Sequence, residues 1–182
     1  MNLRAAVVAV AAVVLAAGCV SRGTEAKPPR GWVTLQAMSG STLKGEATFE
    51  RMEGKWISLR VDVSGVAPGL HAVHIHEHGD CTSPDGKSAG GHWNPTARKH
   101  GKWGQADGEF HLGDLGNIDV GPDGTGNLVL STDQWTMGDG SSTDILAKSI
   151  IVHAKPDDFT TQPTGNAGDR IGCGVIVLQT GR

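Results

Sequence analysis

Apolar and polar residues alternate along much of this chain, with the period of two that is typical of β-strands. The clearest segment is WISLRVDV, residues 56–63, in which the aliphatic side chains share one face and the polar side chains share the other. Weaker strand patterns lie at residues 32–38, 46–51, 127–130, 149–154 and 173–180. No segment has the pattern of a long amphipathic helix, so the chain is predicted to be all-β.

Turn-forming residues separate these segments and set the expected architecture. The chain contains 27 Gly, and pairs such as Ser39-Gly40, Pro68-Gly69 and Asp139-Gly140 fall between the strand patterns. Short strands with turns between them predict a β-sandwich or flattened barrel of about eight antiparallel strands. Residues 77–117 and 155–172 lack the strand pattern and are predicted to be two long loops, which in a compact domain are usually functional.

The first residues of the chain have a different character. Arg4 precedes an apolar run from Ala5 to Ala17, which is shorter than the roughly 20 residues of a membrane span and indicates a secretory signal. The sequence LAAGC at residues 15–19 resembles a bacterial lipobox, in which the cysteine receives the lipid. An ordinary signal cut near Ala17 is the alternative. The expected organisation is a lipoprotein signal peptide at 1–18, a lipidated Cys19 with a flexible tether at 19–30, and one domain at 31–182.

Composition and cysteine content restrict the class of protein further. With 38% hydrophobic and 19% charged residues, the chain is typical of a globular protein, and its formal net charge of −3 argues against a nucleic-acid partner. There are three cysteines, and assigning Cys19 to the lipid leaves Cys81 and Cys173. In an oxidising compartment these two are expected to form one disulfide, with two buried unpaired thiols as the alternative.

Histidines are concentrated where the strand pattern gives way to the first predicted loop. The segment AVHIHEHGDC, residues 72–81, contains three of the eight histidines. In a strand, His74 and His76 project to the same face, so they are half of a metal site or belong to a polar outer face. Further candidates follow at His92, His100, His111, Asp114 and His153. Three imidazoles and one carboxylate suit Zn²⁺, and His153 at a strand end is a candidate ligand for a second metal.

Several longer segments resemble the copper,zinc superoxide dismutase family. They are GLHAVHIHEHGDC, SAGGHWNP, RKHG, HLGDLGNI, VHAKPDD and GNAGDRIGCGVI, in the order in which the family has them. The resemblance extends from about Gly31 to the C-terminus and implies a Greek-key β-sandwich or flattened barrel. It also implies one copper and one zinc ion per subunit. One departure lies in residues 155–172, which lack the Glu/Lys cluster of eukaryotic members and leave Lys87 or Lys155 as substitutes.

The resemblance assigns a role to each candidate residue. The copper ligands it implies are His74, His76, His92 and His153, and the zinc ligands are His92, His100, His111 and Asp114. His92 would bridge both metals and transfer a proton, and Arg170 would attract the anionic substrate. Asp157 would link the rings of His74 and His100. The family disulfide corresponds to Cys81 and Cys173.

The activity implied is dismutation of superoxide to O₂ and hydrogen peroxide by a Cu(II)/Cu(I) cycle, which would protect the cell envelope. A non-catalytic copper/zinc-binding lipoprotein on the same fold, and a structural envelope lipoprotein with incidental histidines, are the alternatives. The expected location is a lipid anchor in a membrane facing the periplasm. Val20 after Cys19 favours the outer membrane in a Gram-negative host. A homodimer is a further possibility.

Overall fold

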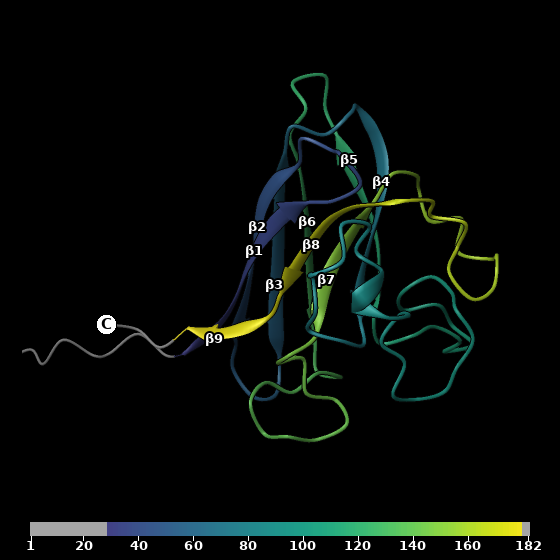
Figure 1. Cartoon of the computed structure of the whole chain (residues 1–182). Coiled ribbons are helices and arrows are strands. Elements are labelled where there is room, and N and C mark those ends of the chain that lie inside the picture. Colours follow the sequence, from purple (N-terminus) through teal and green to yellow (C-terminus); the bar gives the residue numbers. More distant parts are fainter. Residues whose placement is uncertain (1–28, 180–182) are drawn as a thin grey trace, which may run out of the picture.

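The computed structural model describes residues 29–179, which form a barrel of antiparallel strands with long loops on one side (Figure 1). The strands are β1 (Arg30–Ala37), β2 (Lys44–Arg51), β3 (Ile57–Ser64), β4 (Gly69–His76), β5 (Asp114–Val120), β6 (Gly126–Thr132), β7 (Ser149–His153), β8 (Arg170–Val175) and β9 (Val177–Gln179). One short 3₁₀ helix, η1 (Lys87–Ala89), lies between β4 and β5.

The strands hydrogen-bond in the order β2-β3-β6-β5-β4-β7-β8-β1-β9. Because β1 also pairs with β2, eight strands close into a barrel and β9 is an extra strand beside β1. Crossovers place β6 next to β3 and β7 next to β4, as in a Greek key. The prediction of an all-β flattened barrel of about eight antiparallel strands is therefore confirmed.

The barrel interior is filled by the aliphatic faces that the sequence pattern indicated. In β3, Leu59 and Val61 are fully buried, and the intervening Arg60 is exposed. Phe49 packs edge-to-face against Trp135, with ring centroids 5.9 Å apart. Full burial of one such aliphatic or aromatic side chain contributes about 1.5–3 kcal/mol. This core makes the barrel a rigid support for the loops.

Two predicted loop boundaries and one predicted strand are wrong in detail. The first loop ends at residue 113, because Asp114 already begins β5; Gly116 and Asn117, weak strand formers, hid this strand in the sequence. The second loop ends before Arg170, where β8 begins. The strand predicted at 173–180 is divided at Ile176, whose backbone N–H donates to Lys148 O (2.9 Å) and separates β8 from β9.

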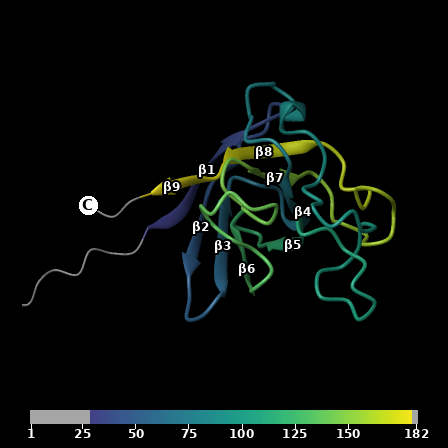
Figure 2. The ribbon, with the colours of Figure 1, turned by 90° about the horizontal axis from the view of Figure 1, so that it is seen from below.

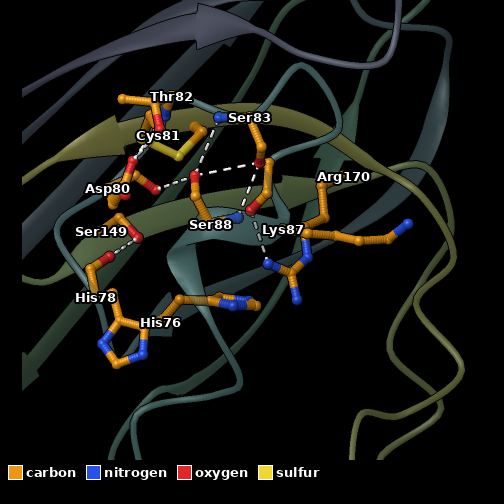
Figure 3. Close-up of a disulfide and its surroundings, with 12 residues drawn as sticks. His76, His78, Asp80, Cys81, Thr82, Ser83, Lys87, Ser88, Ser149 and Arg170 are labelled. Atoms are coloured by element: carbon orange, nitrogen blue, oxygen red, sulfur yellow. Dashed lines mark hydrogen bonds between the residues drawn. A yellow bond between two sulfur atoms is a disulfide. The ribbon is translucent and has the colours of Figure 1, made fainter.

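The two long loops lie on the same side of the barrel, beside β4, β7 and β8 (Figure 2). A disulfide between Cys81 and Cys173 joins the first loop to β8, which confirms the expected pairing (Figure 3). It links residues 92 apart in sequence. In the chain-entropy account, closing a loop of that length in the unfolded chain stabilises the fold by about 4 kcal/mol.

The predicted signal peptide, the predicted lipidation site Cys19 and most of the predicted tether lie outside the described residues. Within residues 29–179, no helix has the length and apolar character needed to cross a membrane.

Candidate metal centre

Four histidines meet where β4 and β7 pass beneath the long loops. His74 and His76 lie on β4 and are fully buried, so the alternative of a polar outer face is wrong. Their neighbours Val73 and Ile75 point into the barrel core. His153 ends β7, the strand paired with β4, and His92 comes from the first loop through an isolated bridge to His76. The potential ligand atoms of these four histidines all lie within 4.8 Å of one another.

A second group shares one member with the first. His92, His100, His111 and Asp114 also have their potential ligand atoms within 4.8 Å of one another, and all four are buried. Asp114 Oδ1 lies 2.9 Å from His92 Nδ1 and 3.1 Å from His111 Nδ1. Asp114 Oδ2 lies 3.0 Å from His100 Nδ1. The two groups are the same sets that the resemblance implied for copper and zinc.

His92 faces both groups with different atoms of one ring. Its Nδ1 contacts the Asp114 carboxylate of the second group, so its Nε2 is the atom available to the first group. The ring of His92 lies 3.9 Å from that of His74 and 5.5 Å from that of His111, measured between centroids. One imidazole thus occupies the boundary between two ligand sets.

Six ring nitrogens at this centre are buried without a hydrogen-bond partner. They are His74 Nδ1, His76 Nε2, His92 Nε2, His100 Nδ1, His111 Nδ1 and His153 Nε2. Burying an unpaired polar group costs free energy, and buried polar atoms in folded proteins are nearly always satisfied. Metal ions held by the two ligand sets would satisfy these atoms, because each atom belongs to a residue of one of the two sets. Three imidazoles with a carboxylate suit zinc, and four imidazoles suit copper.

The ligand-bearing segments are tied together by a ring of three backbone hydrogen bonds. The N–H of Ile75 donates to Gly113 O (2.9 Å), that of Gly113 to Trp93 O (3.0 Å), and that of Trp93 to Ile75 O (2.8 Å). Each of these residues is next to a ligand in sequence. A Cβ at Gly113 would collide with the carbonyl oxygen of Ile75, so glycine is required for this close approach.

Asp157 connects the two groups from the second loop. Its Oδ2 accepts a hydrogen bond from His74 Nε2 (2.7 Å) and its Oδ1 one from His100 Nε2 (2.9 Å). These bonds fix both rings with Nδ1 directed at the ligand sets. The side chain of Asn117 on β5 forms two hydrogen bonds with the backbone of Asp157. Its Oδ1 accepts from the N–H (2.7 Å), and its Nδ2 donates to the C=O (3.1 Å). Sequence reasoning missed Asn117, although it lies within the segment HLGDLGNI.

Arg170 lies at the edge of the first group. Its guanidinium donates hydrogen bonds to Gly86 O (2.8 Å) and Gly90 O (2.7 Å), the residues that flank η1. Gly90 O also lies 3.0 Å from His76 Nδ1, and the His76 ring points toward Arg170 in Figure 3. Partial burial lowers the pKa of Arg170 from its ordinary value, which is so high that the side chain stays charged. A fixed cation therefore stands beside the four histidines.

Comparison with known proteins agrees with this geometry. A family model described as copper/zinc superoxide dismutase matches residues 43–176. The chain belongs to the copper/zinc superoxide dismutase family. A curated relative from Onchocerca volvulus, named superoxide dismutase [Cu-Zn], is 38% identical over 154 residues, covering 79% of this chain and 94% of its own. A solved structure titled crystal structure analysis of the clock protein EA4 has a TM-score of 0.73 and 29% identity, covering 82% of this chain and 94% of that chain.

Copper and zinc are the cofactors of this family. Two of the eight histidines, His71 and His78, lie outside both ligand sets. His71 is buried with both ring nitrogens occupied, at 2.9 Å from His153 O and 2.9 Å from Ala67 O. The His78 side chain is 61% exposed and lies 3.5 Å from Glu77. Of the substitutes considered for attracting substrate, Lys87 is paired with Asp85 at 2.8 Å. Arg170 shares the acceptor Gly90 O with His76 and so lies directly beside this dismutase-family centre.

Burial controls the protonation of the metal-free centre. It lowers the pKa of His92 to about 4 and that of His76 and His153 well below the usual value. Burial also opposes protonation of His100, but the nearby carboxylates of Asp114 and Asp157 prevail and raise its pKa to about 9. The neighbouring imidazoles keep the pKa of Asp114 far below its ordinary range despite burial. The imidazoles of His92, His76 and His153 are therefore neutral near pH 7 and ready to bind metal.

We predict that the metal-free protein loses stability as the pH falls from 7 to 5. His92 titrates at about 6.5 when unfolded and at about 4 when folded, so the unfolded chain binds more protons in this window. The loss from His92 alone is on the order of 2 kcal/mol, and His76 and His153 act in the same direction. His100, whose pKa is raised, opposes this loss by about 1 kcal/mol in the same window, so the net change is still a loss of stability. Denaturant unfolding at both pH values measures it. A His78→Ala variant should show the same difference, and equal stability at pH 5 and pH 7 would contradict this account.

Replacing Asp157 by Asn should weaken metal retention, zinc most directly. In Asp157 each carboxylate oxygen accepts from one ring, that of His74 or that of His100. The side chain of Asn has only one oxygen, so one of the two rings loses the hydrogen bond that orients it. Losses of this kind lower metal affinity roughly 10–100-fold. Zinc release to a coloured chelator measures the effect, with the exposed Asp133→Asn as control. Retention equal to that of the control would remove Asp157 from this role.

Proposed function

We propose that this chain is a superoxide dismutase that protects the cell envelope, where a lipid on Cys19 anchors it to a membrane facing the periplasm. The observation that carries the proposed activity is the pairing of two complete ligand sets through His92, with Arg170 beside the first set. The named relative is a superoxide dismutase and covers most of the chain. No residue of either ligand set is absent from the sequence.

The proposed reaction converts two superoxide anions and two protons into O₂ and hydrogen peroxide. One superoxide loses an electron and leaves as O₂, and the other gains that electron and two protons. His74, His76, His92 and His153 would hold copper, and His92, His100, His111 and Asp114 would hold zinc. Copper, when bound, supplies the Cu(II)/Cu(I) cycle that this electron transfer requires, and zinc supplies a fixed charge that holds the loop and tunes His92.

The protein's own groups bind the anion and move a proton. Arg170 is held by two backbone carbonyls, so its guanidinium keeps one position while a small anion docks. His92 Nε2 is buried beside the first set, where it would carry one of the two protons to the reduced oxygen. The second proton comes from solvent. Since the formal net charge is −3, attraction of superoxide depends on local charge at Arg170.

The proposed location draws on the N-terminal sequence and on the disulfide. The apolar run from Ala5 to Ala17 and the lipobox-like residues 15–19 support export and lipidation. The Cys81–Cys173 disulfide fits an oxidising compartment outside the cytosol. Outer-membrane sorting in a Gram-negative host and assembly as a homodimer stay predictions.

Metal content and turnover measured on one sample test the proposed function. Residues 20–182, expressed in an oxidising compartment and loaded with both metals, should bind about one copper and one zinc per chain and accelerate superoxide decay, as the two complete ligand sets require. Both metals bound without rapid decay would overturn the proposed activity and favour a metal-binding lipoprotein. Failure to bind either metal tightly would contradict the assignment of both ligand sets.

Arg170→Ala should lower the activity roughly tenfold and flatten its dependence on ionic strength, because local electrostatic attraction raises association rates by 10-fold or more. Metal content should be unchanged, since Arg170 belongs to neither ligand set. The assay is superoxide decay at several salt concentrations. Lys55→Ala, which removes the same charge away from the centre, is the control. Unchanged activity in Arg170→Ala would remove its role in docking.

A further inference from the structure

Among the ligand residues, His100 is the one whose backbone is held by a side chain from the other loop. His74, His76, His153 and Asp114 lie on strands, and His92 is held by its bridge to His76. His111 and Asp114 bond each other through backbone N–H and O, at 3.0 Å. Within residues 29–179, the hydrogen bonds of the His100 main chain go to Gln162 alone.

Gln162 lies in the second loop, and its carboxamide forms two hydrogen bonds with the backbone of His100. Its Oε1 accepts from the N–H of His100 (2.9 Å), and its Nε2 donates to the C=O of His100 (2.8 Å). This two-point contact imitates the pairing of two peptide groups in a β-ladder. It fixes the position of the His100 backbone and also its rotation, which a single bond would leave free.

The loop segment that presents Gln162 is itself closed by local hydrogen bonds. Asp158 N–H donates to Gly165 O (3.0 Å), and Gly165 N–H donates to Thr161 O (2.7 Å). The carboxylate of Asp158 accepts from the N–H groups of Thr160 (2.9 Å) and Thr161 (2.8 Å). Gln162 therefore extends from a compact turn whose shape does not depend on His100.

A second bond from the same loop fixes the far end of the same residue. Asp157 accepts from His100 Nε2 at 2.9 Å, so the backbone and the ring tip of His100 are both held by the second loop. Because the backbone and Nε2 of His100 are both fixed, the ring directs Nδ1 toward Asp114 Oδ2, 3.0 Å away. Gly165 lies directly against this pair, where a Cβ would collide with Asp157 Oδ1.

We infer that Gln162 is a positioning residue for zinc, which presets His100 and couples zinc binding to the conformation of the loop that leads to Arg170. This inference rests on the proposed function for its link to turnover, but its link to zinc stands on His100 alone. The amide acts through His100 and touches neither the metal nor the substrate. Loss of the two Gln162 hydrogen bonds frees the His100 backbone but removes none of the seven ligand residues.

The test compares zinc release from zinc-loaded, disulfide-bonded Gln162→Ala with that from the parent protein and from Thr164→Ala. Thr164 is exposed in the same turn and its side chain makes no hydrogen bond among the described residues, so its variant controls for disturbance of the loop. Gln162→Ala should release zinc to a chelator roughly tenfold faster, in the range for partners that orient a ligand. Thr164→Ala should match the parent protein.

Two further readouts separate positioning from general stability. Cobalt(II) bound in place of zinc should change its visible spectrum in Gln162→Ala, because the spectrum reports ligand geometry. The unfolding midpoint of the metal-free variant should match that of metal-free Thr164→Ala. Zinc release within twofold of the Thr164→Ala value, or an unchanged cobalt spectrum, would overturn the inference.

A second variant keeps the test decisive if Gln162→Ala fails to fold. Gln162→Glu retains an acceptor for the N–H of His100 but sets an oxygen against its C=O, so it should also release zinc faster than Thr164→Ala. Equal rates of zinc release from Gln162→Glu and Thr164→Ala would overturn the inference. A parent protein that retains zinc but does not accelerate superoxide decay would contradict the proposed function. The role of Gln162 would then still be tested by the rate of zinc release.

Discussion

The burial of charged and polar ligands in one small volume is the constraint on which the rest of this structure depends. Seven ligand side chains lie almost fully buried, and six of their ring nitrogens have no hydrogen-bond partner in the protein. Water would satisfy these atoms if the loops were open, so the loops must be held closed against that alternative. The disulfide, the ring of backbone bonds at Ile75, Trp93 and Gly113, and the carboxylate of Asp157 each oppose opening.

The centre therefore divides into a rigid part and a part that is held by loop contacts. His74, His76 and His153 lie on two paired strands of the barrel, so the β-ladder fixes their spacing without help from the loops. His100 has no strand beneath it and takes its position from Gln162 and Asp157. The copper-type set is for this reason the more rigid of the two. The zinc-type set depends more on the order of the second loop.

The sequence predicted the fold and the rigid part of the site better than the loop contacts. Alternation in WISLRVDV placed Leu59 and Val61 correctly in the core, and the spacing of His74 and His76 placed both on one face of a strand. The roles expected of Asp157 and Arg170 came from resemblance, because neither residue has a spacing that reveals its partner. Asn117 and Gln162 were missed since a side chain that bonds a distant backbone leaves no period in the sequence. β5 was missed in the prediction because Gly116 and Asn117 obscure its pattern.

Closure of the barrel joins opposite ends of the domain. β1, the first strand, pairs with β8, which begins at Arg170 and carries Cys173. Pairings so distant in sequence give a high contact order and slow folding. A ribosome must therefore finish almost the whole chain before the barrel can close, the disulfide can form or Arg170 can reach its carbonyls. Under the proposed export, this delay would keep the chain unfolded during translocation, and metal capture would follow as the last step of maturation.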